Sequence, residues 1–347
     1  MGSITKAKEL ILKTKKSSNR TKLNLNQCSL TDIEKDIPEL FELENLDSLD
    51  LSNNKLKNIS GLSKLKNLKV LNLACNNITD ISELSKLLNL KVLHIYCNDI
   101  TNISELSSLL NLKILDLSSN QISNIESLKY LTKLTYLDIE GIENNNINVI
   151  GNLINLTYLN IGFNSIRNIS VIQNLTNLEI LYACNNTIRD ISALTNLTKL
   201  KKLDISTNKI DSILGLKCLV NLKYLDVSEN YIKNISPLDN LVLLKHLNIS
   251  TNIIQSIRVL KNLVNLTELY CYNNNISNIT ALKNLSKLTL LSIHTNEIVD
   301  IICLINHFKR DIQIDFVDNF LNEKSIELIK KYNPKSISKY EYNTSDD

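Results

Sequence analysis

The stretch Leu90–Asn111 reads LKVLHIYCNDITNISELSSLLN, and its pattern occurs twelve times in the chain at an unbroken spacing of 22 residues. The shared unit is LxxLxLxxNxIxxIxxLxxLxN, which begins at Leu46 in the first copy and at Leu288 in the last. Its fourth residue is leucine and its fourteenth is isoleucine in all twelve copies. Self-similarity at one short period indicates a solenoid, in which each repeat packs only against its neighbours.

Each part of the unit has a structural interpretation. The segment LxLxx alternates like a short strand, and one strand per repeat predicts a parallel sheet with neighbours ~4.8 Å apart. Asparagine stands at the ninth position in eleven of the twelve repeats, from Asn54 to Asn296. Its amide can satisfy backbone groups of the turn in its own and adjacent coils. The apolar residues at positions 11, 14, 17 and 20 recur every three residues, which favours a 3₁₀-like or irregular return path over an α-helix.

This unit resembles that of leucine-rich-repeat proteins of the 22-residue class, which phosphatase-regulatory repeat proteins and internalins share. The resemblance covers about residues 20–309. It implies an α/β solenoid, a curved leucine-rich-repeat horseshoe with a parallel β-sheet on the concave face. The convex side is expected to be 3₁₀ or irregular, with helical caps covering the two apolar ends of the stack.

The organisation along the chain follows from where the repeat begins and decays. We expect a cap helix over residues 1–19, one degenerate and twelve regular repeats over 20–309, a cap strand and helix over 310–333, and a disordered tail over 334–347. The fifth repeat departs from the pattern, with Ile142 in the asparagine position and Asn144 in an isoleucine position. A local bulge is expected there, either as a recognition loop or as a tolerated slip.

Composition excludes several classes of protein. The chain is 43% hydrophobic with a formal net charge of +3 over 347 residues, which is typical of a globular protein without a required nucleic-acid or membrane partner. No signal-peptide pattern or run of membrane-spanning length occurs. Its seven cysteines are an odd number scattered singly, unlike a secreted disulfide framework. We therefore expect a monomer in the cytoplasm or nucleus.

The exposed strand positions of the unit, its third, fifth, seventh and eighth residues, are expected to line the concave face. Aromatic side chains gather there: Tyr96, Tyr136, Tyr158, Phe163, Tyr182, Tyr224, Tyr270 and Tyr272. Tyrosine offers large contact area and a polar tip at a small entropic cost, which indicates an interface with a protein partner. The alternative is that tyrosine simply suits an exposed strand.

Acidic residues occupy the same positions, against the single cation Lys202. They are Asp50, Asp116, Asp138, Glu140, Asp204, Asp226, Glu229 and Glu268. The expected partner therefore presents basic and apolar groups, and nucleic acid is disfavoured because its phosphates would meet carboxylates. In the phosphatase-regulatory proteins that this chain resembles, the concave face holds the catalytic subunit through similar side chains. That resemblance implies a phosphatase-regulatory scaffold, and the internalin resemblance implies an alternative, surface recognition or adhesion.

Catalysis and metal binding have little support in the sequence. The sequence holds no Gly-rich phosphate loop, nucleophile elbow or zinc-protease motif, so we expect a non-enzymatic protein without cofactor or metal. Cys75 and Cys97 share the eighth position of adjacent repeats. They could be unpaired, form a labile disulfide, or join His94 and Asp116 at a metal. Cys271 replaces an inward aliphatic residue and is expected to be a small core hydrophobe.

Overall fold

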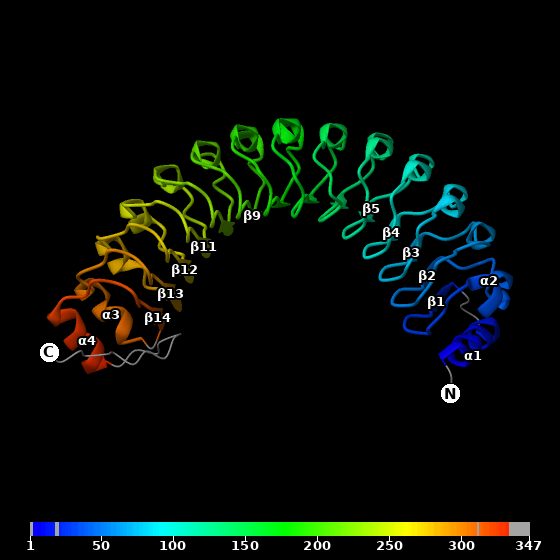
Figure 1. Ribbon diagram of the computed structural model, residues 1–347, viewed down its shortest axis with the longest axis horizontal. Helices are drawn as coiled ribbons and strands as arrows, with labels where there is room; N and C mark the ends of the chain where they lie inside the picture. Colours follow the sequence, from blue (N-terminus) through cyan, green and yellow to red (C-terminus); the bar gives the residue numbers. More distant parts are fainter. Residues whose placement is uncertain (1–2, 18–20, 311, 333–347) are drawn as a thin grey trace. The chain divides into compact units, whose positions relative to one another are not determined.

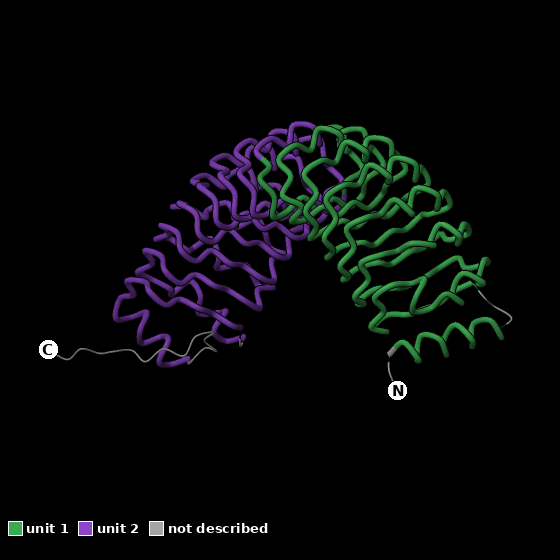
Figure 2. Tube along the Cα trace, turned by 45° about the vertical axis from the view of Figure 1, so that its right-hand side comes forward, with its two compact units in different colours: residues 1–166, 174–178 green, residues 167–173, 179–347 purple. Residues whose placement is uncertain are grey.

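The structure, a computed structural model, describes residues 3–17, 21–310 and 312–332. The chain forms two compact units (Figures 1 and 2). Unit 1 comprises residues 1–166 and 174–178, and unit 2 comprises residues 167–173 and 179–347. The tail expected at 334–347 lies outside the described residues.

Three-residue strands, one per repeat, form the sheet of each unit. Those of unit 1 are β1 Lys22–Asn24, β2 Ser48–Asp50, β3 Val70–Asn72, β4 Val92–His94, β5 Ile114–Asp116, β6 Tyr136–Asp138 and β7 Tyr158–Asn160. Those of unit 2 are β8 Ile180–Tyr182, β9 Lys202–Asp204, β10 Tyr224–Asp226, β11 His246–Asn248, β12 Glu268–Tyr270, β13 Leu290–Ser292 and β14 Gln313–Asp315. Within each unit consecutive strands pair in parallel, and equivalent repeat positions face one another, as Leu71 faces Leu93.

Short 3₁₀-helices return the chain to the next strand. In unit 1 they are η1 Pro38–Glu42, η2 Leu62–Lys64, η3 Ser82–Lys86, η4 Ser104–Ser108, η5 Glu126–Tyr130 and η6 Asn148–Asn152. The next, η7 Ser170–Asn174, has its first four residues in unit 2 and its last in unit 1. In unit 2 they are η8 Ser192–Asn196, η9 Leu214–Leu216, η10 Ser236–Leu238, η11 Arg258–Asn262, η12 Thr280–Asn284 and η13 Ile302–Leu304. Within each unit the strands lie on the concave side and these helices on the outer side (Figure 1). The period of three therefore predicted the return path correctly.

A column of aliphatic side chains fills the interior, and a column of asparagines joins its coils. Leu71 and Ile81, like their counterparts in the other repeats, are essentially inaccessible. The Asn76 amide nitrogen donates to the carbonyls of Leu51 at 3.1 Å and Leu73 at 3.0 Å. Its carbonyl oxygen accepts the backbone N–H of Leu56 at 3.0 Å. Each such asparagine thus satisfies buried backbone groups in two coils, as the pattern predicted.

Both ends of the solenoid carry helices. The first is α1 Ser3–Lys16, which buries Ala7 and Ile11, and α2 Ile33–Asp36 follows β1. The last are α3 Ile305–Phe308 and α4 Glu323–Tyr332. The Ser325 hydroxyl of α4 accepts the N–H of Ile301 at 3.1 Å and donates to the carbonyl of Val299 at 3.3 Å, which ties this helix to the last regular repeat.

The fifth repeat keeps its register despite its irregular sequence. Strand β6 pairs residue for residue with β7. Ile142 is fully buried, and the amide nitrogen of the buried Asn144 donates to the carbonyl of Ser123 at 2.9 Å. The local departure is an additional left-handed residue, Glu143, with φ of 59°. The expected bulge is therefore confined to one turn, because the swapped side chains still find inward positions.

No helix among the described residues is both long and apolar enough to cross a membrane.

Candidate functional site

The side chains on either side of each buried strand leucine make the concave face. In β10, Tyr224 and Asp226 are partly exposed while Leu225 between them is fully buried. Side chains alternate along a strand and parallel pairing keeps the register, so each repeat position forms a row across neighbouring strands. The predicted residues at the third and fifth positions therefore lie in two such rows within each unit.

In unit 1 the face carries a stacked tyrosine pair. The rings of Tyr136 and Tyr158 lie 4.0 Å apart between centroids, with planes 8° apart. The Tyr158 hydroxyl donates to an Asp138 carboxylate oxygen at 3.3 Å. The Asn160 amide nitrogen donates to the same oxygen at 3.1 Å and to Glu140 at 2.7 Å. The pair thus packs beside two carboxylates that share one amide donor.

Asp138 is the buried carboxyl group of this cluster. Its residue is only 7% exposed. Burial raises the pKa of Asp138 to about 6, and the charges of Asp116 and Glu140 add to that rise against the hydrogen bonds from Glu140 N–H and Asn160. A carboxylate with raised pKa and no lysine or arginine partner is electrostatically suited to a cation brought by another molecule.

Further along unit 1, Asp116 and Tyr96 form a second, looser group. His94 Nδ1 lies 3.9 Å from an Asp116 carboxylate oxygen. The Ser118 hydroxyl donates to the other Asp116 oxygen at 2.7 Å. Burial raises the pKa of the half-buried Tyr96, with further contributions from the Cys75 thiol and Asp116. The histidine and the carboxylate that were weighed as metal ligands therefore form a loose pair.

In unit 2 a longer row crosses β9 to β12 at the third repeat position. The Lys202 ammonium lies 4.5 Å from the centroid of the Tyr224 ring, which stacks on His246 at 4.2 Å and 7°. His246 Nδ1 then meets a Glu268 carboxylate oxygen at 2.8 Å. This row of cation, phenol, imidazole and carboxylate is continuous from one strand to the next.

The fifth repeat position supplies the parallel row of unit 2, with Tyr182 and Tyr270 as its aromatic members. Lys202 lies 5.0 Å from the Tyr182 ring centroid, and His246 lies 5.4 Å from that of Tyr270. Between these tyrosines stand Asp204 and Asp226, each accepting a serine hydroxyl, from Ser206 at 2.7 Å and Ser228 at 2.6 Å. Burial raises the pKa of Asp204, and Asp226 contributes to that rise.

Burial and the same carboxylates also raise the pKa of Tyr224. Its pKa is raised first by burial and then by the carboxylates of Asp226 and Asp204. A phenol held neutral in this way keeps its proton available for donation to an acceptor on a bound molecule.

The seventh and eighth positions lie beyond the strands. Tyr272 stacks on His294 with centroids 4.4 Å apart and planes 9° apart. Phe163 and Glu229 occupy left-handed backbone, with φ of 53° for both, and the Phe163 side chain is 53% exposed. These two predicted residues therefore belong to the turns that follow the strands.

Sequence reasoning missed two members of the face, His246 and His294. Both occupy positions at which the tyrosines had been singled out. Reading all rings in those positions, and not only the phenols, would have found them. Their stacking on Tyr224 and Tyr272 makes them part of the same aromatic surface.

The cysteine pair is brought together by the register. Cys75 and Cys97 are both free thiols in left-handed backbone, with φ of 55° and 54°. The Asn76 N–H donates to the Cys97 carbonyl at 3.2 Å, which holds the two turns side by side. Burial followed by the neighbouring Cys97 raises the pKa of Cys75. Cys271 is fully buried, in agreement with its expected core role. No cluster of three or more His, Cys, Asp or Glu side chains suited to a metal ion occurs in the described part of the chain.

Comparison with known proteins places these observations in a family. A family model described as leucine-rich repeats in two copies matches residues 44–86, 66–108, 88–130, 154–196 and 176–218. The gap between these matches, residues 131–153, contains the irregular stretch Glu140–Ile147 of the fifth repeat. No curated protein matches the chain by sequence.

Solved structures extend the comparison. An internalin, inlF, from Listeria monocytogenes is 32% identical, with 87% of this chain and 94% of that chain covered and a TM-score of 0.69. A leucine-rich-repeat protein of Leptospira interrogans, 21% identical, covers 96% of this chain and 98% of its own with a TM-score of 0.79, and shows the fold alone. The fold is that of a protein-interaction module, and no catalytic family is indicated. The chain belongs to the leucine-rich-repeat proteins, and its repeats resemble those of internalins.

Proposed function

We propose that this chain is a non-enzymatic recognition module that binds a protein partner on the concave faces of its units. The observation that carries the proposal is the set of stacked aromatic side chains beside carboxylates, Tyr136 with Tyr158 and Tyr224 with His246. Stacked rings are already ordered, so a partner that covers them gains contact area at a small entropic cost.

The partner's chemistry follows from the charge of these surfaces. None of the face carboxylates forms an ion pair with a lysine or arginine among the described residues. Burial raises the pKa of Asp138 and of Asp204, and their hydrogen bonds and, at Asp204, the charge of Lys202 offset that rise only in part. A partner surface bearing lysine or arginine among apolar groups would supply that charge and fill the space over the rings.

The test replaces the rings and leaves the fold intact. One variant combines Tyr136→Ala with Tyr158→Ala, a second combines Tyr182→Ala with Tyr224→Ala, and the control combines Tyr130→Ala with Tyr231→Ala. The control tyrosines are 52% and 57% exposed and lie outside the concave positions. Partners purified with the tagged chain should be lost from the first two variants and kept by the control. Identical partners from all three folded proteins would reject the concave-face assignment.

Two biological roles for this recognition can be distinguished by where in the cell the chain is found. The internalin similarity, at 32% identity over most of both chains, supports a surface recognition or adhesion role. The aromatic and acidic character of the face supports the other role, in which the partner is a phosphatase catalytic subunit. In that role the chain would be a monomer in the cytoplasm or nucleus. Labelling of intact source cells with a membrane-impermeant biotin reagent separates the two. Labelled chain supports the surface role, and chain labelled only after lysis supports the internal one.

A further inference from the structure

The outer side of unit 2 carries a depression that the concave-face proposal does not use. It has a volume of about 480 Å³ and lies between η11 and η12. Its charged and polar lining includes Ser256, Arg258, Lys261, Asn278, Thr280 and Lys283. Three cations and no carboxylate surround this space.

These cations are not neutralised within the chain. Arg258, Lys261 and Lys283 are exposed, and none of them forms an ion pair with a carboxylate of the described residues. Like charges held together without a counter-ion raise one another's electrostatic energy, which a bound anion relieves. The depression is therefore electrostatically prepared for negative charge.

Neutral polar side chains also line the depression. Ser256 and Asn278 form an isolated parallel bridge between the two repeats. The Asn278 carbonyl oxygen accepts the backbone N–H of Thr280 at 2.9 Å and its hydroxyl at 2.7 Å. The Asn278 amide nitrogen has no acceptor among the described residues and can donate to a ligand.

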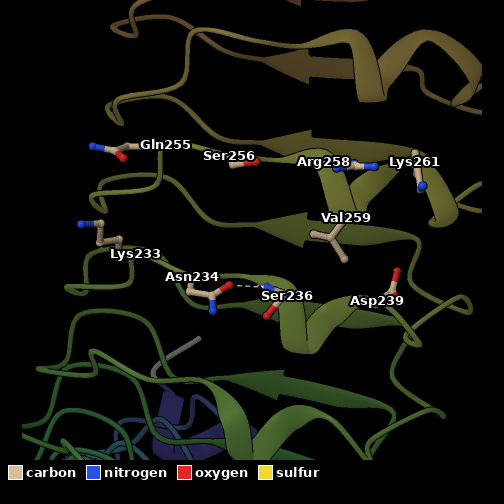
Figure 3. A pocket seen from close by; sticks show the side chains of 9 residues that line it. All are labelled: Lys233, Asn234, Ser236, Asp239, Gln255, Ser256, Arg258, Val259 and Lys261. Atoms are coloured by element: carbon tan, nitrogen blue, oxygen red, sulfur yellow. Dashed lines mark hydrogen bonds between the residues drawn. The ribbon is translucent and has the colours of Figure 1, made fainter.

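A neighbouring depression of about 580 Å³ shares Arg258 and Lys261 and adds Lys233 (Figure 3). It also contains one carboxylate, that of Asp239. This group already accepts a hydrogen bond from the Asn262 amide at 2.6 Å. Arg258 and Lys261 thus stand between two open spaces, of which the one toward Lys283 is free of acid.

The same place in unit 1 shows that the charge is not a by-product of the repeat. There a smaller depression of about 260 Å³ is lined by Asn102, Ser104, Glu126 and Lys129, among others. Its cation is neutralised, since Lys129 lies 3.5 Å from Glu126. Position 18 of the unit carries cations in two consecutive repeats only at Lys261 and Lys283.

We propose that the depression between η11 and η12 is a binding site for a phosphate-class oxyanion with more than one charge. The Arg258 guanidinium offers a planar fork that matches two oxygens of one phosphate, and the two lysines supply mobile ammonium donors. The chemistry is the same for a soluble polyphosphate and for a phosphorylated lipid headgroup.

The test uses the full chain and two double variants of equal charge. Arg258→Gln with Lys261→Gln removes the shared cations, and Lys55→Gln with Lys57→Gln removes two exposed cations of unit 1. Calorimetric titration with inorganic tripolyphosphate at low ionic strength should show equal binding by wild type and the unit 1 variant. The other variant should bind at least tenfold more weakly.

A second arm identifies the source of the phosphate. Sedimentation with phosphatidylcholine vesicles, with and without a phosphoinositide, measures headgroup binding by the same proteins. Binding to either probe that is lost only on removal of Arg258 and Lys261 supports the site and names its source. Equal binding by both double variants, or no wild-type binding to either probe, overturns it. Neither outcome depends on the concave tyrosines, so this proposal and the concave-face proposal fail separately.

Discussion

Tyr224 and His246 stack face to face on the adjacent strands β10 and β11, with ring centroids 4.2 Å apart and planes 7° apart. They are paired because both are the third residue of their repeats, and parallel pairing places equal positions opposite each other. The same rule builds the asparagine column, the cysteine pair and the outer depressions. Each of these can be tested by changing one member of its column.

Asn230 is expected to contribute strongly to stability. Its amide donates to the carbonyls of Ile205, Val227 and Ser228 and accepts the N–H of Ile210, at 2.9–3.2 Å. Asn230→Ala leaves the buried Ile210 N–H without a partner, while each of the three carbonyls keeps one other donor. It should therefore lower the free energy of unfolding by about 1–3 kcal/mol. Urea denaturation followed by circular dichroism measures the change.

The matched control is Asn221→Ala, which removes an exposed amide with a single bond to the Thr198 carbonyl at 2.8 Å. Its effect should stay below about 1 kcal/mol, because water replaces that bond. If both variants lost the same free energy of unfolding, burial of the asparagine would not determine its contribution to stability.

Asp138 should make stability depend on pH. Burial raises the pKa of its carboxyl group to about 6, above the usual value of about 4. The folded chain therefore binds this proton more tightly than the unfolded chain. The resulting stability is complete below about pH 4 and is lost as pH rises through about 6.

Asp138→Asn cannot ionise and should be more stable than wild type by about 1–2 kcal/mol at pH 8, with the difference closing near pH 4. Thermal unfolding across this range measures it, and Asp99→Asn, at an exposed position, controls for loss of one charge. Parallel pH profiles of wild type and Asp138→Asn would contradict the prediction.

His307 is expected to destabilise the C-terminal end in acid. It is 1% exposed, its Nδ1 has no hydrogen-bond partner among the described residues, and burial followed by Arg310 lowers its pKa. The pKa of His307 is thus lower in the folded chain than its value of about 6.5 in the unfolded chain. Folding is therefore favoured fully above about pH 6.5, and this stability is lost as the pH falls through the folded-state pKa.

Restoring the leucine of the repeat, by His307→Leu, should therefore raise the free energy of unfolding by about 1–2 kcal/mol near pH 5, and by less near pH 8. Differential scanning calorimetry at both values measures it. His294→Leu, at a half-exposed ring, makes the same exchange outside the core. A gain at pH 8 that equals the gain at pH 5 would show that protonation is not the cause.

Cys75 and Cys97 should react together with a short bifunctional thiol reagent. They follow the paired strands β3 and β4 at the same repeat position. Because burial and the neighbouring Cys97 raise the pKa of Cys75, reaction should be faster at pH 9 than at pH 7. Peptide mapping after treatment with dibromobimane should recover Cys75 linked to Cys97, and Cys97→Ser should abolish that link. Recovery of Cys75 and Cys97 only as separately modified peptides would contradict the register of unit 1.

The sequence by itself determined the repeat and therefore the fold. Leucine at position four and asparagine at position nine recur so regularly that their inward and column-forming roles follow from periodicity alone. The left-handed backbone at position eight was not visible, because Cys75, Cys97 and Phe163 are not residues that favour it. Hydrogen bonds between coils, such as Cys75 N–H to the Tyr96 carbonyl at 2.9 Å, hold it in place.

The tertiary structure alone decided how equal positions differ. Asp116 and Asp138 share position five, yet Asp138 accepts hydrogen bonds from Tyr158 and Asn160, whereas Asp116 accepts one from the Ser118 hydroxyl. Burial raises the pKa of Asp138 to about 6. Likewise, Lys129 is paired with Glu126, whereas Lys261 and Lys283 border an open space without an acid. Periodicity says which residues share a column, but burial, stacking and charge depend on the side-chain atoms that meet across neighbouring coils.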